Sequence, residues 1–212
     1  FMAGADITEF GGGPKPPPLS EVIDALSASP KIIVAALFGT AFGGGLEVAL
    51  GCDYRVALAT AKIGLPEVKL GIIPGAQGTQ RLPRLTSVDF ALKTMTSGDP
   101  VPAPAAHRAG AIDRLVEGDV VDGAVAYAKE LLADNAPLRK IQKMTIDAKA
   151  FDDDYFDVYR KSIARKTRGM NAPERAIKAV QAAVNLPFKD GVAFEREMTR
   201  ESVADPQSKA LQ

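Results

Sequence analysis

Two glutamates, each beside a glycine-containing turn, are the residues of this sequence best suited to chemistry. Glu47 follows three consecutive glycines in "FGGGLEVAL", and Glu67 lies in the apolar segment "GLPEVKLGIIPG". Either glutamate alone would usually be a partly exposed or capping residue. Two of them in apolar segments, however, are typical of carboxyl groups with raised pKa values, which transfer protons near neutral pH.

The glycines before Glu47 also need an explanation, because glycine loses more conformational freedom on folding than any other residue. A phosphate-binding loop is disfavoured, since the stretch from Gly39 to Gly45 lacks a Gly-Lys-Ser/Thr ending. A strand, a glycine turn and a helix N-terminus remain, and they present backbone N–H groups that suit a developing negative oxygen. "MAGADI" holds a second turn, in which Gly4 would direct the N–H of Ala5 outward. The two turns are either ordinary strand-to-helix connections or the halves of an oxyanion hole.

Composition disfavours several other classes of protein. The 212 residues are 46% hydrophobic and 25% charged, which is typical of a globular protein with a sizeable core. No apolar run reaches the roughly 18 residues that span a bilayer, and 26 basic against 26 acidic residues give no net charge to attract nucleic acid. One cysteine, Cys52, excludes an intramolecular disulfide, and with one histidine, His107, it leaves little for a metal site. We therefore expect no metal, no membrane span and no nucleic-acid partner.

Elements that would position the glutamates alternate between strand and helix in the first half of the chain. This order predicts an α/β architecture with mostly parallel strands, either a spiral or a doubly wound sheet. The segment Gly11–Leu19, rich in glycine and proline, predicts an exposed loop, and the chain beyond Thr86 is mainly helical. The expected helices are 20–29, 46–52, 87–100, 104–116, 121–135, 172–186 and one that starts at 152–154; the expected strands are 31–39, which we expect to be buried on both faces, 54–60 and a short one near 62; and 71–78 is expected to lie in a loop.

Three motifs together resemble one known family. "FMAGADITEF", "GTAFGGGLEVALGCDYRVA" and "IGLPEVKLGIIPGAQGTQRLPRL" look like the enoyl-CoA hydratase/isomerase, or crotonase, family in order and spacing. The later "AVNLPFKDGVAFEREM" and "PQSKALQ" resemble the helical end of the hydratase/isomerase part of multifunctional fatty-acid β-oxidation enzymes, in which a 3-hydroxyacyl-CoA dehydrogenase part follows. The resemblance covers at least Phe1 to about Gly118.

The resemblance implies a fold and a set of site residues. The fold would be a spiral of repeated β-β-α units with a helical C-terminal region and with the family's N-terminal part missing, divided into a core at 1–135 and a helical region at 136–212. Backbone N–H groups of Ala5 and Gly44 would form an oxyanion hole for the thioester carbonyl. Glu47 and Glu67 match the two catalytic glutamates, and Gly75 matches a backbone donor near the attacked β-carbon.

The implied activity is hydration of trans-2-enoyl-CoA to 3-hydroxyacyl-CoA, with double-bond isomerisation as a second activity. Because both glutamates are present, a hydratase is favoured over a pure Δ3-Δ2-enoyl-CoA isomerase or a non-catalytic acyl-CoA-binding fragment. CoA would belong to the substrate, so no separate cofactor is expected. The expected partners are the acyl-CoA thioester and either further copies of the chain or a dehydrogenase domain. The expected location is the bacterial cytoplasm, or the peroxisome in a eukaryote.

Overall fold

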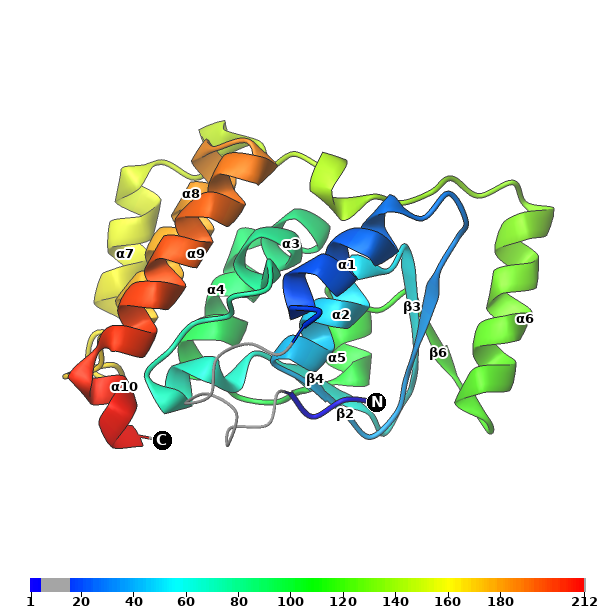
Figure 1. The fold of residues 1–212 in the computed structure, drawn as a ribbon, viewed down its shortest axis with the longest axis horizontal. Helices are drawn as coiled ribbons and strands as arrows, with labels where there is room; N and C mark the ends of the chain where they lie inside the picture. Colours follow the sequence, from blue (N-terminus) through cyan, green and yellow to red (C-terminus); the bar gives the residue numbers. More distant parts are fainter. Residues whose placement is uncertain (5–15, 212) are drawn as a thin grey trace. The chain divides into compact units, whose positions relative to one another are not determined.

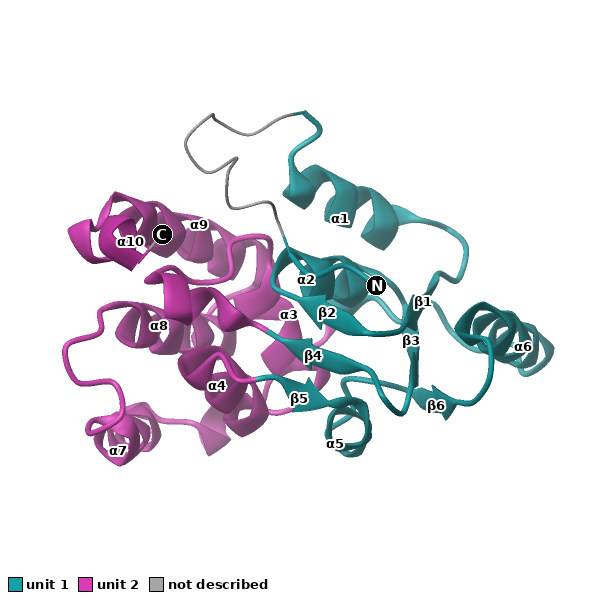
Figure 2. Ribbon diagram, turned by 90° about the horizontal axis from the view of Figure 1, so that it is seen from below, with its two compact units in different colours: residues 1–64, 100–141 teal, residues 65–99, 142–212 magenta. Residues whose placement is uncertain are grey.

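A computed structural model describes residues 1–4 and 16–211 (Figure 1). The chain forms two compact units, each built from two separate stretches of sequence (Figure 2). Unit 1 comprises residues 1–64 and 100–141, and unit 2 comprises residues 65–99 and 142–212. Unit 1 contains the strands, and the described elements between Leu65 and Asp99 and after Gln142 are helical.

Two small sheets form the centre of unit 1. The first has the order β1-β3-β6 with both pairs parallel, and the second has the order β2-β4-β5, in which β2 and β4 are parallel and β4 and β5 antiparallel. From β1 to β4 successive strands enter different sheets, so the chain alternates between the two sheets over these four strands, as the predicted spiral requires. The strands are β1 (Val34–Leu37), β2 (Thr40–Phe42), β3 (Tyr54–Leu58), β4 (Lys62–Gly64), β5 (Val101–Pro102) and β6 (Arg114–Val116).

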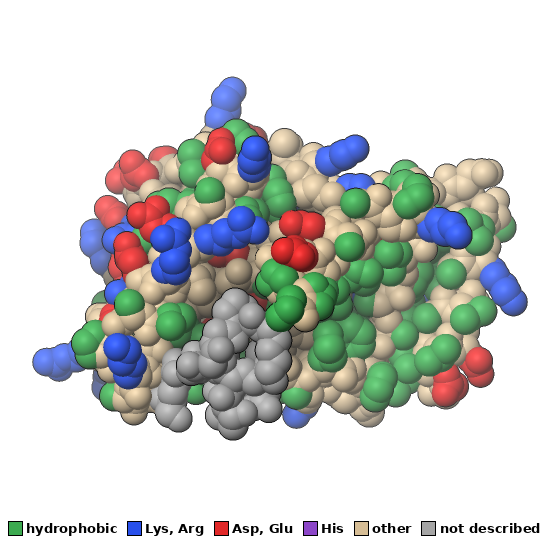
Figure 3. Space-filling model, viewed as in Figure 1, with side chains coloured by type: hydrophobic (Ala, Val, Ile, Leu, Met, Phe, Trp, Pro, Cys, Tyr) green, Lys and Arg blue, Asp and Glu red, His purple; other side chains and the backbone are tan. Residues whose placement is uncertain are grey.

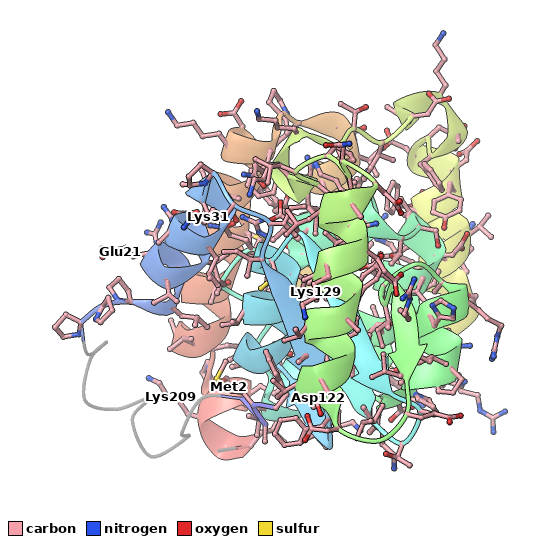
Figure 4. The ribbon with its side chains drawn as sticks, turned by 90° about the vertical axis from the view of Figure 1, so that its right-hand side faces the viewer. Met2, Glu21, Lys31, Asp122, Lys129 and Lys209 are labelled. Atoms are coloured by element: carbon pink, nitrogen blue, oxygen red, sulfur yellow. The ribbon has the colours of Figure 1, made fainter. Side chains whose placement is uncertain are left out.

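Four helices lie among the described residues of unit 1. The longest, α6, packs against β1 and β3 with Val120 and Ala124 on Val56, and it lies in front of these strands in Figure 4. The exposed side of α6 carries Asp122 and Lys129, so the helix is amphipathic as its sequence pattern predicts. The helices are α1 (Leu19–Ala28), α2 (Gly44–Gly51), α5 (Ala103–Arg108) and α6 (Val120–Ala133).

Unit 2 is organised around α8, which packs against α3, α4, α7 and α9. Pro173 lies in the first turn of α8, where a missing N–H removes no helical hydrogen bond, and one face of the helix is buried alanine, valine and isoleucine. The elements are the 3-10 helices η2 (Pro66–Leu70), η3 (Ile141–Lys143, which starts in unit 1) and η4 (Ala148–Ala150), and the α-helices α3 (Gly78–Leu85), α4 (Val88–Ser97), α7 (Asp153–Ile163), α8 (Ala172–Asn185), α9 (Phe188–Ala204) and α10 (Pro206–Leu211).

Several predicted elements are confirmed. The helices expected at 20–29, 87–100, 121–135 and 172–186 correspond to α1, α4, α6 and α8, and the strand expected at 54–60 corresponds to β3. Asp152 caps α7 by accepting a hydrogen bond from the N–H of Tyr155, as expected for a helix start. Most of the expected loop at 11–19 and the turn after Gly4 lie outside the described residues.

Four expectations about elements are wrong. Strand β1 is not buried on both faces, because half-buried and buried residues alternate along it. Helix α2 begins at Gly44, inside the glycine run and not after it. Gly78, which we expected in a loop, starts the helix α3, and the helix expected at 104–116 ends at Arg108 and gives way to β6.

The polar residues with possible metal chemistry are accounted for structurally. His107 is exposed on α5, where its Nδ1 lies 2.9 Å from the carbonyl oxygen of Ile112, and Cys52 is buried. Among residues 1–4 and 16–211, no group of three or more His, Cys, Asp or Glu side chains is arranged to hold a metal. No helix in these same stretches is long and apolar enough to cross a membrane.

On the face drawn in Figure 3, hydrophobic side chains gather over unit 1 between α1 and α6.

Candidate active site

The N-terminus of α2 is the centre of the candidate site in unit 1. Gly43 precedes the helix with φ 53°, a left-handed value that favours glycine. Its N–H donates to the carbonyl of Gly64 at 3.0 Å, which fixes the turn to the end of β4. Gly44 is the first helical residue, so its N–H has no carbonyl partner within the helix and lies at the positive end of the helix dipole.

The segment Phe1–Gly4 packs against this helix start. The carbonyl of Met2 accepts a hydrogen bond from the N–H of Phe42 at 3.0 Å. A Cβ added to Gly45 would lie 2.2 Å from that same carbonyl oxygen, so only glycine allows the approach. Gly4 has φ 117° and lies beside the carbonyl of Phe42. The two turns that we expect to carry oxyanion donors are therefore neighbours in unit 1, although Ala5 lies outside the described residues.

Glu47 lies in the first turn of α2 and is only 3% exposed. Its N–H donates to the carbonyl of Gly43 at 3.0 Å. The surrounding residues of the helix, Leu46 and Ala49 among them, are apolar and buried. Burial of a carboxylate among apolar residues is costly and requires compensation.

A buried arginine holds the other end of α2. Arg55 on β3 is fully buried; its Nη1 donates to the carbonyls of Ala49 at 3.2 Å and Cys52 at 3.0 Å, and its Nε donates to that of Ala111 at 2.9 Å. Burial lowers its pKa to about 10, although the nearby Asp113 carboxylate opposes the shift. The guanidinium thus ties the C-terminal end of α2, through the carbonyls of Ala49 and Cys52, to the segment that carries Ala111.

Glu67 lies in the 3-10 helix η2 of unit 2 and is half-buried. Its carbonyl accepts a hydrogen bond from the N–H of Ile72 at 3.2 Å, which closes the helix. Ser208 on α10 donates to the carbonyl of Leu70 at 3.0 Å, and Gly98 at the end of α4 packs closely on Val68. The segment that carries Glu67 is therefore fixed by two helices of its own unit.

Gly75 lies in the loop between η2 and α3 and is exposed. A Cβ at this position would lie 2.7 Å from Cγ2 of Thr199 on α9, so the loop and that helix are in close contact. Two residues further on, Gln77 adopts the left-handed conformation with φ 79° directly before α3. This loop is thus tightly constrained within unit 2.

The predicted site residues are divided between the units. Gly44 and Glu47 belong to unit 1, whereas Glu67 and Gly75 belong to unit 2. Their roles stay predictions.

Sequence reasoning missed three residues of these two regions. Gly45 is one of three consecutive glycines, and no signal in the sequence distinguishes it from the other two. Arg55 could have been found as a charged residue inside the apolar strand "YRVAL", because arginine is almost never fully buried unless it is paired.

Glu195 on α9 is a buried carboxylate that accepts hydrogen bonds from the N–H groups of Gln77 and Thr79. It could have been found because it shares a helix face with Val192 and Met198, both of which are buried.

Comparison with known proteins identifies the family. Residues 1–160 match the profile of the enoyl-CoA hydratase/isomerase family. The chain is 41% identical to the human peroxisomal bifunctional enzyme over 214 residues, which cover 100% of this chain and 30% of that protein. It is 39% identical to the peroxisomal bifunctional enzyme of Danio rerio over 212 residues, which cover 100% of this chain and 29% of that protein. A solved structure of an enoyl-CoA hydratase from Bacillus anthracis matches with a TM-score of 0.58 and 26% identity over 96% of this chain and 68% of that one.

The chain therefore belongs to the enoyl-CoA hydratase/isomerase family, and the expected α/β fold of that family with a helical C-terminal region is confirmed. It spans about 30% of the length of the curated relatives named above.

Proposed function

We propose that the chain hydrates trans-2-enoyl-CoA thioesters to 3-hydroxyacyl-CoA, as a step of fatty-acid β-oxidation. The observation that carries this proposal is the placement of Glu47, a buried carboxylate in the first turn of α2, directly after the glycine turn that packs on Met2. Family membership supports it independently.

The oxyanion hole is formed by the N–H groups of Ala5 and Gly44. Both follow glycine turns whose neighbouring residues are in contact, and Gly44 adds the positive end of the α2 dipole. As water adds to the β-carbon, the thioester becomes enolate-like and its oxygen gains negative charge. Donors fixed in advance stabilise that charge by about 3 kcal/mol each in comparable acyl chemistry.

The two glutamates divide the addition of water between them. Glu47 holds the water and accepts its proton as the hydroxyl bonds to the β-carbon, while Glu67 delivers a proton to the α-carbon. The N–H of Gly75 helps to orient the reacting end of the acyl chain. The reaction needs no cofactor beyond the CoA of the substrate. Glu67 acting alone on a 3-enoyl thioester would move the double bond, which accounts for a second, isomerase activity.

The surroundings of this activity are also proposals. The named relatives are peroxisomal bifunctional enzymes, which supports a hydratase part that works beside a 3-hydroxyacyl-CoA dehydrogenase part. The same names support a peroxisomal location if the chain is eukaryotic; a bacterial chain would act in the cytoplasm.

The test is turnover of crotonyl-CoA, followed by the loss of the ultraviolet absorbance of its conjugated thioester. A 3-enoyl thioester is assayed in parallel through formation of the conjugated product. We expect hydration of the 2-enoyl substrate to be the faster reaction. Turnover of the 3-enoyl substrate without hydration would support a pure isomerase, and turnover of neither would contradict the proposal.

A further inference from the structure

Glu195 on α9 is a fully buried carboxylate that the proposed mechanism does not use. Its Oε1 accepts a hydrogen bond from the N–H of Gln77 at 2.6 Å. Its Oε2 accepts two more, from the N–H of Thr79 at 3.0 Å and from Oγ1 of Thr79 at 2.5 Å. These donors lie at the N-terminus of α3, so the charge is compensated by short hydrogen bonds and by the helix dipole.

The bonds to Glu195 hold a strained piece of backbone. Gln77 has φ 79°, a conformation that is unfavourable for a residue with a Cβ. Its side-chain oxygen accepts hydrogen bonds from Nε and Nη2 of Arg81, at 2.9 and 2.6 Å. Strained conformations persist only where the surroundings enforce them, and they concentrate at functional sites.

Helix α9, which carries Glu195, also contacts the loop on the other side of Gln77. Thr199, one turn after Glu195, places Cγ2 within 2.7 Å of where a Cβ of Gly75 would lie. Its hydroxyl donates to the carbonyl of Glu195 at 2.8 Å and lies 3.4 Å from that of Pro74. Gly191 allows α9 to approach the side chain of Gln80 closely. Helix α9 therefore fixes the loop both at Gly75 and at the start of α3.

We infer that Glu195 is a positioning residue for the hydration reaction, which sets the direction of the Gly75 N–H by fixing the loop from Pro74 to Thr79. The inference rests on the proposed function, because the loop matters only if Gly75 donates to the reacting end of the substrate. An N–H misplaced by about 1 Å can lower the rate by up to a hundredfold, without contact between Glu195 and substrate.

The substitution Glu195→Gln, made in the full natural protein, tests the inference. The amide NH2 of glutamine opposes one of the N–H donors, so the loop must shift while the side-chain volume is kept. We expect kcat for crotonyl-CoA to fall at least about tenfold, with KM within about threefold. The reason is that the contact of the Gly75 N–H with the reacting end of the substrate would be made mainly in the transition state. Thr79→Val removes one of the three donors to Glu195 named above, together with the oxygen that accepts a hydrogen bond from Nε2 of Gln80, and we expect it to lower kcat by a smaller factor.

Two controls separate positioning from a general loss of stability. Glu197→Gln makes the same chemical change at an exposed position of α9, and we expect no change in kcat. Phe156→Leu destabilises the fully buried core of α7, and we expect unchanged kcat per folded molecule. Circular dichroism gives the folded fraction of each variant. If Glu195→Gln does not fold, the decision falls to Thr79→Val.

The outcomes are distinct for the inference and for the function on which it rests. If the wild type hydrates crotonyl-CoA and folded Glu195→Gln has an unchanged kcat, the inference alone is contradicted. If Glu195→Gln does not fold, an unchanged kcat in Thr79→Val contradicts it in the same way. A fall in kcat of equal size in Phe156→Leu also contradicts it, because destabilisation would then explain the effect. A wild-type protein that does not hydrate crotonyl-CoA contradicts the proposed function itself.

Discussion

Replacement of Gly45 by alanine tests whether contact between α2 and the segment Phe1–Gly4 sets the oxyanion geometry. The added Cβ would lie 2.2 Å from the carbonyl oxygen of Met2 and 2.8 Å from its Cβ. Since real contacts of this kind are at least about 3 Å, the backbone at Met2 must move by roughly 1 Å, and overpacking of this kind costs about 2 kcal/mol. The same carbonyl accepts the hydrogen bond of Phe42, which the movement would break.

The expected loss of stability follows from three contributions. Overpacking costs about 2 kcal/mol, and loss of the hydrogen bond costs about 1 kcal/mol. Alanine gains about 1 kcal/mol over glycine within a helix. Gly45→Ala should therefore lower the free energy of unfolding by about 2 kcal/mol. Because Gly4 directly precedes Ala5, the shift should also displace an oxyanion donor, and kcat should fall by at least about tenfold.

Urea unfolding and crotonyl-CoA kinetics measure the two effects. Gly51→Ala is the matched control, because Gly51 ends the same helix and its added Cβ would lie 3.2 Å from Cγ2 of Ile23, which requires a shift of only a few tenths of an ångström and involves no clash with a backbone carbonyl. We expect the control to change stability by less than about 1 kcal/mol and to leave kcat unchanged. A Gly45→Ala protein with wild-type stability and rate would refute the reasoning.

Two further predictions concern charged residues away from the glutamates. Arg55→Met should lower the free energy of unfolding in urea by about 3 kcal/mol, because it removes one of the two arginines paired with Asp113 and the donor to several buried carbonyls; a loss below about 1 kcal/mol would contradict this. Hydrogen bonds from the N–H of Gln207 and from Arg175 lower the pKa of Asp205 from 3.8 to about 2. Its stabilising contribution is therefore present above pH 3.8 and is lost as the pH falls toward 2. Asp205→Asn should weaken the pH dependence of the free energy of unfolding across that interval. An unchanged pH dependence would contradict the assignment.

Local patterns in the sequence predicted the secondary structure where one signal dominated. The helix at α8 has an early proline and a regular apolar face, and β3 is a continuous apolar run apart from Arg55. The prediction failed where two signals competed. Glycine is a poor helix former, yet Gly45 lies in the first turn of α2, because the approach of Met2 requires a residue without a Cβ there. Tertiary packing there outweighs local propensity.

The candidate site was predictable in its chemistry but not in its support. Glu47 and Glu67 stand out because carboxylates are unusual in apolar segments. Their supporting residues do not, since the contact between Gly45 and Met2 joins segments more than forty residues apart, and that between Glu195 and Gln77 joins segments 118 residues apart. Such contacts depend on the fold as a whole, which a local pattern does not contain.

The most direct test of the account is the rate of crotonyl-CoA hydration by Glu47→Gln and Glu67→Gln. Glutamine keeps the volume of each side chain but cannot exchange protons, so each variant should lose at least about a hundredfold in turnover. Glu117→Gln in unit 1 and Glu197→Gln in unit 2 make the same change at exposed positions and should match the wild type. If both glutamate variants instead hydrate crotonyl-CoA within about tenfold of the wild-type rate, the two-carboxylate mechanism is wrong.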